Sequence, residues 1–462
     1  MHDLIRRLKR GPFVVCVGLS ACNGGERLVE SRAKAAAFGP TAPATAALHA
    51  VATAPGLSKA ARVGKDLFFD QALSASGSMS CATCHDPAVA YGPPNALSVQ
   101  LGGPKHLDPG VRAVPSLMYK EYTPPYADLL DNPDGFSAPG PGGGFAWDGR
   151  ANTLAEQAAA PLLSLFEMAN ESPAKVVERV RAASYRGRFL EAFGDHALDD
   201  ADAAFKDVEA ALQAFQLEDT SFHPYTSKFD LHSGNKIGGD FTAAEARGLQ
   251  VFADPKKGNC SSCHFQGAGL NGSSGLFTDF SYEAIGVPRN ASIPANADAS
   301  KSDLGICGPL RTDHVAEDAK SGRFCGMFKT PTLRNVTLRT AFFHNGVIHS
   351  LEQAIRFYAT RDTIPELWYP TLGGMPKAVP DPTFPTYGLV TVQYEGGRVA
   401  KFDDLLKPYR DNVDSQMPLD GRKRSSKAPL NDPEIKDLIC FLHTLTDGYQ
   451  PGVTPTVPGC TS

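Results

Sequence analysis

Two short segments of the chain share one pattern of cysteine and histidine residues. The first reads C-A-T-C-H at residues 81–85, and the second reads C-S-S-C-H at residues 260–264. Two thiols at this spacing, followed directly by an imidazole, are the attachment signature of a c-type haem. The thiols bond covalently to the porphyrin, and the histidine becomes the proximal iron ligand. The sequence therefore predicts two covalently bound c-type haems, one on Cys81, Cys84 and His85 and one on Cys260, Cys263 and His264.

The same cysteine spacing also occurs in zinc knuckles, in thioredoxin-like redox pairs and in plain disulfides. A zinc site needs further cysteine or histidine ligands at short spacing. The sequence has no second close pair of such residues beside either motif. Haem attachment is therefore the preferred interpretation, with metal binding and a disulfide as the open alternatives.

The residues before the two motifs are also alike. The segment A-R-V-G-K-D-L-F-F-D at 61–70 precedes the first motif, and E-A-R-G-L-Q-V-F-A-D at 245–254 precedes the second. Each predicts an amphipathic helix that ends in aromatic or apolar residues, followed by a loop into the cysteines. An internal repeat of this length indicates two haem domains in tandem.

Length and composition agree with a loop-rich helical fold. A chain of 462 residues supports two or three domains, and its 44 glycines and 36 prolines favour loops folded around a cofactor. Strand-like alternation is scarce, so the predicted fold class is mostly α: two tandem cytochrome-c-like haem domains with long ordered loops. The clearest helical patterns cover residues 172–190, 202–217, 350–360 and 433–446.

The N-terminus has the pattern of a targeting segment. Basic residues at positions 6–10 precede an apolar stretch at 12–21, which is too short to span a bilayer. The stretch ends in L-S-A-C, which resembles a bacterial lipoprotein cleavage box with Cys22 as the lipidated residue; ordinary secretion is the alternative. We expect a protein of the periplasm, with peripheral attachment to the outer membrane if Cys22 is lipidated. The expected parts are a signal peptide at 1–22, a disordered tether at 23–52, and haem domains at 53–225 and 226–462.

The remaining cysteines indicate an oxidising compartment. Without the leader and the haem motifs, four cysteines are left, and four cysteines allow three pairings. The short loops favour 307–325 and 440–460, although the sequence does not settle the pairing. The alternative for Cys440 is a buried thiol in an apolar helix. The four residues are Cys307, Cys325, Cys440 and Cys460.

From about residue 55 to 450 the chain resembles the bacterial dihaem cytochrome c peroxidase and MauG family. The resemblance rests on blocks that occur in the family's order: W-D-G-R-A at 147–151, L-A-E-Q-A-A-A-P at 154–161, E-M at 167–168, F-K-T-P-T-L-R-N at 328–335 and F-H-N-G at 343–346. It implies an enzyme that uses hydrogen peroxide as oxidant, with the N-terminal haem as the peroxidatic one.

The resemblance also implies which residues face the peroxide. His85 is expected to bind one face of the first haem, with Gln157, Pro161 and Glu167 on the open face. Peroxide must lose a proton to react, and the departing oxygen must gain one, so a carboxylate at Glu167 can carry that proton. The Gln157 amide can orient the oxygens, and Pro161 adds no competing N–H donor. Taken singly, each residue also fits an ordinary helical or surface position.

Two aromatic residues are expected near the second haem. The family fills the position opposite the second histidine with either Met or Tyr, and here that position is Tyr358, in R-F-Y-A-T at 356–360. A tyrosine ligand stabilises high-valent iron and marks the MauG branch, whereas a methionine gives a high-potential electron-transfer haem. Trp147 matches the family tryptophan that passes charge between the haems. The alternatives are a half-buried helical tyrosine and a core tryptophan.

Two further features are less clear in the sequence. The family holds a calcium ion with an Asn side chain and two backbone carbonyls, which correspond to those of Arg339 and Ala341. Here Ala113 replaces the Asn, which weakens the calcium prediction without removing it, because water can fill the missing position. His106 lies where some peroxidases have a loop histidine that blocks the resting haem. A solvated loop histidine is the favoured interpretation.

Three functions remain open from the sequence. The one favoured by Tyr358 is MauG-like oxidation of residues in a partner protein. The others are an ordinary cytochrome c peroxidase, draining a small periplasmic cytochrome or cupredoxin, and a non-enzymatic dihaem electron carrier. The Gln157, Pro161 and Glu167 set speaks against the carrier, which needs no acid–base group. A net charge of −5 gives no indication of nucleic-acid binding.

Overall fold

The fold consists mainly of helices joined by long loops. In 375–380 and 390–395 only the backbone is described, and the predicted signal peptide (1–22) and tether (23–52) lie outside the described residues. The described residues from Gly56 onward belong to one compact unit. The computed structural model describes residues 56–135, 137–268, 273–312, 322–373, 375–380, 390–419 and 421–461.

Both helices predicted to precede the haem motifs are present. Ser58 caps the first of them by accepting a hydrogen bond from a backbone N–H of the first turn. Thr242 and Glu245 form a capping box at the start of the second. The helices are α1 (Lys59–Phe69), α2 (Cys81–Cys84), α3 (Leu154–Leu163), α4 (Pro173–Ala182), α5 (Arg186–Phe193), α6 (Ala201–Glu218), α7 (Lys228–Ser233), α8 (Ala243–Ala253), α10 (Leu351–Thr360) and α11 (Asp432–His443).

The predicted helix at 172–190 is instead two helices, α4 and α5. Ser172 caps α4, but the backbone becomes extended at Ala183. The cause is Tyr185, whose ring is buried and whose hydroxyl donates to Asp70 at 2.7 Å. This contact with the end of α1 requires the chain to turn before α5 begins. The other predicted helices correspond to α6, α10 and α11, with ends that differ by up to a few residues.

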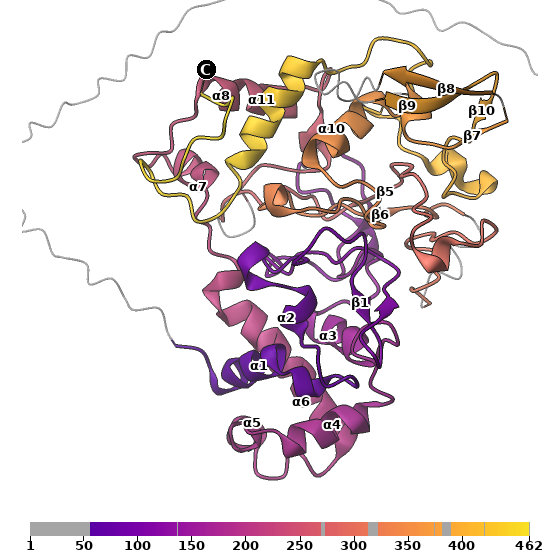
Figure 1. The fold of residues 1–462 in the computed structure, drawn as a ribbon. Coiled ribbons are helices and arrows are strands. Elements are labelled where there is room, and N and C mark those ends of the chain that lie inside the picture. Colours follow the sequence, from indigo (N-terminus) through magenta and orange to yellow (C-terminus); the bar gives the residue numbers. More distant parts are fainter. Residues whose placement is uncertain are drawn as a thin grey trace, which may run out of the picture. The chain divides into compact units, whose positions relative to one another are not determined.

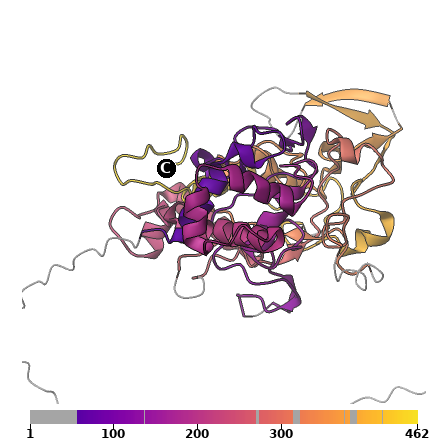
Figure 2. The same ribbon diagram turned by 90° about the horizontal axis from the view of Figure 1, so that it is seen from below.

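Strands are short and pair two at a time into antiparallel ladders. The longest ladder joins β8 to β9 and lies at the edge of the described structure in Figure 2. The strands are β1 (Leu101–Gly102), β2 (Asp108–Pro109), β3 (Ala127–Leu130), β4 (Gly140–Gly142), β5 (Tyr282–Glu283), β6 (Phe328–Lys329), β7 (Thr371–Leu372), β8 (Met375–Pro380), β9 (Val390–Glu395) and β10 (Arg398–Val399).

Two pairs of helices cross in the same way. A Cβ atom on Gly64 of α1 would lie 1.9 Å from the carbonyl oxygen of Ala211 in α6. A Cβ atom on Gly248 of α8 would lie 2.0 Å from the carbonyl oxygen of Asp437 in α11. In each pair only glycine allows the two backbones to approach this closely. The sequence repeat before the two haem motifs is therefore also a repeat of helix packing.

Each crossing lies beside its own hydrophobic core. The first core gathers buried side chains of α1, α3, α4 and α6, and the second gathers those of α8, α10 and α11. In Figure 1 the helices from α1 to α6 lie together, and α8, α10 and α11 lie together elsewhere in the same unit. A separate core beside each haem motif provides an apolar surface against which a porphyrin can pack.

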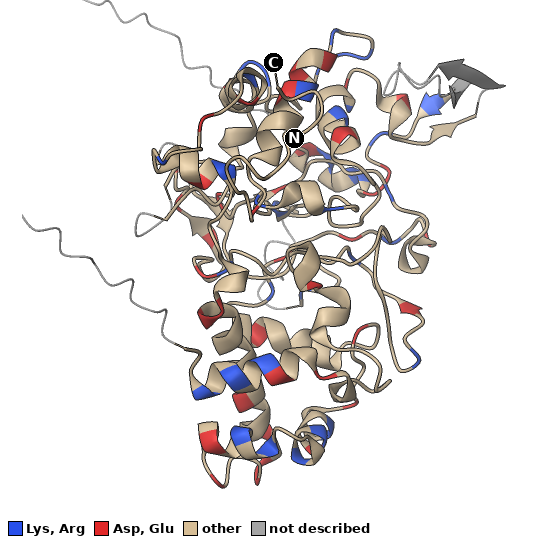
Figure 3. Cartoon of the chain, turned by 60° about the vertical axis from the view of Figure 1, so that its left-hand side comes forward, with Lys and Arg blue, Asp and Glu red and all other residues tan. Residues whose placement is uncertain are grey.

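In Figure 3, acidic and basic residues are interspersed along the helices at the lower end of the picture. Mixed charge of this kind is typical of a solvated surface. Within the described part of the chain, no helix is both long and apolar enough to cross a membrane.

The close crossing of α1 and α6 predicts a selective sensitivity to added volume. Gly64→Ala should lower the free energy of unfolding of the haem-loaded protein by about 1–3 kcal/mol, because the new methyl group meets a backbone carbonyl. Gly187→Ala, in α5, is the matched control, since nothing lies within 4 Å of a Cβ atom there. Denaturant titration should find the control at least as stable as the parent. Equal stability of the two variants would contradict the packing account.

Candidate active site

The first haem motif opens onto a cavity of about 330 Å³. Cys81 and Cys84 lie at the two ends of α2, and His85 follows directly. The Nδ1 atom of His85 lies 3.1 Å from the carbonyl oxygen of Tyr91, which leaves Nε2 for another ligand. Removal from bulk water lowers the pKa of His85 to about 4, so the imidazole is neutral. A neutral imidazole fixed through Nδ1 to a backbone carbonyl is typical of a metal ligand.

The second motif repeats this arrangement around a cavity of about 240 Å³. Cys260, Cys263 and His264 all line this cavity. The Nδ1 atom of His264 lies 3.1 Å from the carbonyl oxygen of Phe277, and removal from bulk water again lowers the pKa of the imidazole to about 4. The two predicted haem sites thus present their histidines in the same way.

The motif cysteines do not resemble a zinc or redox site. All four are free thiols. Removal from bulk water raises the pKa of Cys81 to about 12 and that of Cys84 to about 11, so both are neutral rather than thiolates. Among the described residues, no three His, Cys, Asp or Glu side chains gather into a metal site. Neutral thiols beside a large cavity fit covalent haem attachment better than either alternative.

The four remaining cysteines form the two disulfides that the short loops favour, so that pairing is confirmed. Cys307 bonds to Cys325, and Cys440 bonds to Cys460. The alternative of Cys440 as a buried free thiol is wrong.

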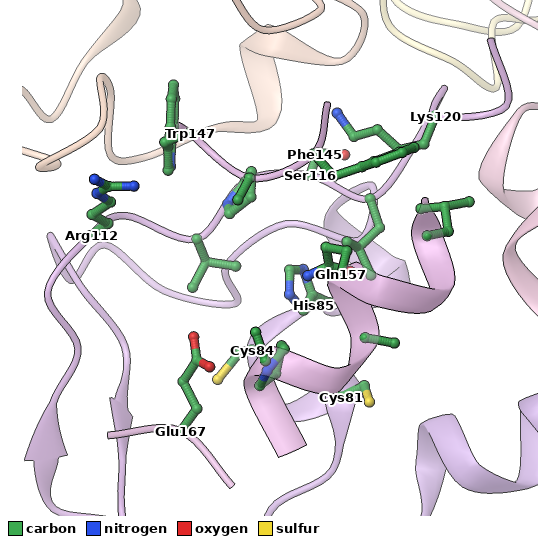
Figure 4. Close-up of a pocket in the computed structure, with 18 of the residues that line it drawn as sticks. Cys81, Cys84, His85, Arg112, Ser116, Lys120, Phe145, Trp147, Gln157 and Glu167 are labelled. Carbon is green, nitrogen blue, oxygen red and sulfur yellow. The ribbon is translucent and has the colours of Figure 1, made fainter. Parts of the chain in front are cut away.

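Three predicted residues line the first cavity, and Figure 4 labels two of them, Gln157 and Glu167. Gln157 and Pro161 lie one turn apart on α3, and Glu167 lies on the turn after it. Because Pro161 has no N–H, the carbonyl group of Gln157 loses its usual helical partner. The Glu167 carbonyl accepts a hydrogen bond from the N–H of Gly103 at 2.8 Å, which fixes this turn against β1. The structure therefore brings together the amide and carboxylate that the sequence predicts.

The proton affinity of Glu167 is higher than that of an ordinary glutamate. The side chain is exposed, but it faces the cavity rather than open solvent. Removal from bulk water raises its pKa, while the charge of Arg150 and a hydrogen bond from Ser164 act in the opposite direction. A carboxylate with a raised pKa can both accept and return a proton near neutral pH.

The two cavities have one boundary in common. We call the residues that line both of them the shared wall. Trp147 is one of these residues, and its indole N–H donates to the carbonyl of Ala113 at 2.7 Å. Its own carbonyl accepts from the N–H of Lys329 at 2.9 Å, so both ends of Trp147 are held. The shared wall consists of Pro115, Ser116, Lys120, Trp147 and residues 329–332.

A buried ion-pair network holds the residue next to Trp147. Asp148 is fully buried and accepts from Arg112 at 2.7 Å and from Arg150 at 2.9 Å. Arg112 also binds both carboxylate oxygens of Asp303, at 2.6 and 2.7 Å. Bidentate pairs of this kind fix orientation as well as distance. The network therefore fixes the position of the loop that carries Trp147.

The shared wall also contains two lysines that the sequence analysis did not single out. Removal from bulk water lowers the pKa of Lys120 to about 8 and holds that of Lys329 well below its ordinary value. Neither lysine forms a salt bridge with a described residue. The Nζ atom of Lys329 donates a hydrogen bond to the carbonyl of Gly143 at 2.8 Å. Basic side chains beside the two cavities would be suited to the propionate carboxylates of haem, which would favour the charged forms of both lysines. Lys120 belongs to no sequence motif. Lys329 lies in the family block at 328–335, but nothing in that block indicates that its side chain borders both cavities.

Tyr358, carried by α10, lines the second cavity together with His264. Removal from bulk water raises the pKa of Tyr358, and so does the negative charge of Asp414 and Glu283. A tyrosinate therefore forms here only if a cation binds its oxygen, as ferric iron would. Met417, which no sequence motif indicates, lines the same cavity and offers a thioether. Its backbone carbonyl accepts from Asn259, next to the second haem motif.

Two further predictions concern a loop histidine and a calcium ion. His106 lies in the turn between β1 and β2, with a φ of 56°, and is not among the described residues that line the first cavity. The carbonyl of Ala341, expected to bind calcium, accepts two hydrogen bonds from the guanidinium of Arg339. Ala113 offers no side-chain oxygen at the position where the family has Asn. These residues do not fit a calcium ion.

Comparison with known proteins identifies the family. The sequence profile described as di-haem cytochrome c peroxidase matches residues 58–236. The methylamine utilization protein MauG of Paracoccus denitrificans (strain Pd 1222) is 37% identical over 306 residues, which are 64% of this chain and 73% of that protein. The chain belongs to this dihaem peroxidase family.

Further relatives agree on the class of enzyme. The cytochrome c551 peroxidase of Nitrosomonas europaea is 30% identical over 308 residues, covering 66% of this chain and 74% of that protein. The crystal structure of the diheme peroxidase BthA from Burkholderia thailandensis E264 superposes with a TM-score of 0.72 at 34% identity, covering 88% of this chain and 90% of that one. The chain is thus a dihaem peroxidase with two c-type haems, which excludes the electron-carrier alternative.

The position and environment of Glu167 predict a loss of peroxide reactivity when it cannot take a proton. Glu167→Gln should slow the reaction with peroxide by about 10²-fold or more. If the carboxylate acts as the base, the wild-type rate should fall as pH drops through a pKa above the ordinary value of about 4.3. That limb of the pH profile should vanish in the variant. Stopped-flow kinetics with two haems per chain verified in each protein measures both effects.

Glu171→Gln is the matched control for this experiment. It makes the same chemical change on an exposed side chain four residues away, outside the first cavity. Its rate and pH profile should equal those of the wild type. A wild-type rate in a fully loaded Glu167→Gln variant would remove the proposed role of the carboxylate.

Proposed function

We propose that this chain is an exported dihaem peroxidase of the MauG-like branch. It reduces hydrogen peroxide in the first cavity and withdraws two electrons from residues of a partner protein. Hydrogen peroxide takes up these two electrons and two protons to give two water molecules. The single observation that carries the proposal is the shared wall, in which Trp147 separates a cavity equipped with Gln157 and Glu167 from one equipped with Tyr358.

The chain's own residues supply the proton chemistry. When bound, the haems supply redox-active iron, held by His85 in the first cavity and by His264 in the second. Glu167 takes the proton from the incoming peroxide and returns it to the departing oxygen. The Gln157 amide orients the oxygens, and Pro161 shapes the site without offering a donor that would compete.

Charge exchange between the two sites is assigned to Trp147. Its indole is oriented by the Ala113 carbonyl, and its backbone is bonded to Lys329 of the second half of the chain. An aromatic ring fixed from both sides can relay an electron without reorganising. Oxidising equivalents produced in the first cavity can therefore be shared with the second, where a protein substrate too large to enter is oxidised from outside.

Tyr358 favours the MauG-like reaction over a simple relay. A hard anionic ligand lowers the potential of the second haem and stabilises its oxidised states, whereas a thioether raises the potential. Met417 supports a second candidate, because a thioether ligand at this site is typical of an ordinary cytochrome c peroxidase. That enzyme would drain electrons from a small periplasmic cytochrome or cupredoxin.

The remaining assignments concern organisation and compartment. The repeated helix crossings, at Gly64 and at Gly248, support two tandem haem domains at 53–225 and 226–462. The two disulfides support an oxidising compartment such as the periplasm. Attachment to the outer membrane through a lipid on Cys22 remains part of this proposal.

Two variants in the second cavity decide between the candidates. The wild-type diferric enzyme should react with stoichiometric peroxide without prior reduction and form a long-lived state two electrons above the resting one. Tyr358→Phe should abolish that state, and Tyr358→Met should raise the potential of the second haem and make activity depend on pre-reduction. Spectroelectrochemistry and stopped-flow absorption measure the two properties.

Met417→Leu is the control that removes the competing ligand and keeps the volume similar. It should leave the potential, the spectrum and the reactivity of the diferric enzyme unchanged. A second haem with two strong ligands should give a low-spin ferric signal in electron paramagnetic resonance. If Met417→Leu loses this signal while Tyr358→Phe keeps it, the thioether is the ligand. The chain would then be an ordinary cytochrome c peroxidase.

A further inference from the structure

The guanidinium of Arg339 binds two backbone carbonyls from different halves of the chain. Its Nη2 atom lies 3.1 Å from the carbonyl oxygen of Val114 and 3.1 Å from that of Ala341. Its Nε atom lies 3.3 Å from the same Ala341 oxygen. Arg339 therefore links Val114, which directly precedes Pro115 of the shared wall, to Ala341 in the second half of the chain.

The Ala341 carbonyl is one of the two backbone carbonyls, together with that of Arg339, that the family resemblance implies as calcium ligands. Calcium needs six to eight oxygen ligands at about 2.3–2.6 Å. Here the Ala341 oxygen is already taken by two N–H donors. Ala113 has only a methyl group, and its carbonyl accepts the indole N–H of Trp147. Of the ligands that the resemblance implies, the Asn side chain is missing and the Ala341 carbonyl is occupied, and the Arg339 carbonyl by itself does not make a calcium site.

A guanidinium is nevertheless a cation with several donors in a fixed fork. Removal from bulk water lowers the pKa of Arg339 to about 10, which still leaves it charged at neutral pH. In the described part of the chain it has no carboxylate partner. Its side chain lines the second cavity, where a charge without a partner is stable only beside an anion. The propionates of a haem supply such an anion.

We propose that Arg339 takes the place of the calcium ion, so that this enzyme carries its bridging cation within its own sequence and does not need the metal. A covalently attached cation cannot be removed by a chelator or diluted away. The inference holds whichever partner the enzyme oxidises, because it concerns the shared wall between the two cavities.

Arg339 acts through the segment that it holds. Val114 lies between Ala113 and Pro115, and Ala113 both accepts from Trp147 and donates its N–H to the carbonyl of His344 at 2.7 Å. Pro115 is part of the shared wall. Holding the Val114 carbonyl therefore keeps the Trp147 acceptor in position. Arg339 is in this sense a positioning residue, and its positive charge also acts on the sites on both sides of the wall.

The first test uses the wild-type holoenzyme. Calcium content by elemental analysis should be far below one per chain, and calorimetric titration with up to about 1 mM calcium should give no heat of specific binding. Dialysis against EGTA should leave the melting temperature, the haem potentials and the peroxide kinetics unchanged. Stoichiometric calcium whose removal alters any of these would overturn the proposal.

The second test changes the cation. Arg339→Gln keeps N–H donors but removes the charge, which should lower the potentials of both haems, since a nearby cation favours the reduced form. Arg188→Gln is the matched control: Arg188 pairs with Asp66 on the surface and lines neither cavity. The control should leave both potentials unchanged. Unchanged potentials in Arg339→Gln would mean that Arg339 only supports the fold, and would overturn its role as the bridging cation.

A third variant restores the metal. Arg339→Ala combined with Ala113→Asn frees the carbonyls and returns the side-chain ligand that the family uses. This double variant should gain a calcium-dependent rise in melting temperature that EGTA reverses, and Arg339→Ala alone should gain less. If the double variant ignores calcium although it folds and binds haem, the two cations do not occupy the same place. If it does not fold, the Arg339→Gln potentials decide.

Discussion

The two cavities of this enzyme have one wall in common, and the rest of the structure serves to hold that wall. Its residues come from segments far apart in the sequence: Lys120 from one, Trp147 from another, and 329–332 from the second half of the chain. Neither cavity is complete until both halves have folded against each other. A change on one side of the wall therefore reaches the other side through direct contacts rather than over a long path.

Charge imposes a second constraint on the same region. Lys120, Lys329 and Arg339 are basic groups removed from bulk water, which disfavours their charged forms, and none forms a salt bridge with a carboxylate of the described residues. Isolated charges in such surroundings are strongly unfavourable. Haem propionates would compensate them, so the binding of the haems and the folding of the wall stabilise each other. In the protein without haem, the shared wall should accordingly be much less stable than the helix crossings at Gly64 and Gly248.

Local patterns in the sequence predicted much of this arrangement. The two C-x-x-C-H motifs, the helices before them and the favoured disulfide pairs depend on short spacings, and the structure has all of them. The placement of Gln157 and Glu167 in one cavity followed from a family block rather than from the residues alone. The site roles of these residues stay predictions, because geometry alone does not test chemistry.

What the sequence did not reveal depends on contacts between distant segments. The break between α4 and α5 follows from the Tyr185–Asp70 hydrogen bond, which no local pattern announces. Met417 reaches the second cavity from a loop far from Tyr358 in the chain. The poor fit of the predicted calcium site also depends on contacts that no local sequence pattern indicates. Backbone carbonyls carry no residue signature, so the sequence could not indicate that the Arg339 side chain already occupies one of them.

The most direct test of the shared wall is electron paramagnetic resonance of the diferric enzyme titrated with hydrogen peroxide. The resting protein should give one high-spin and one low-spin ferric signal, from the first and second haem respectively. If the wall lets the two sites share oxidising equivalents, one equivalent of peroxide should remove both signals together. Loss of the high-spin signal alone, with the low-spin signal intact, would show that the two haems act separately and would contradict the account.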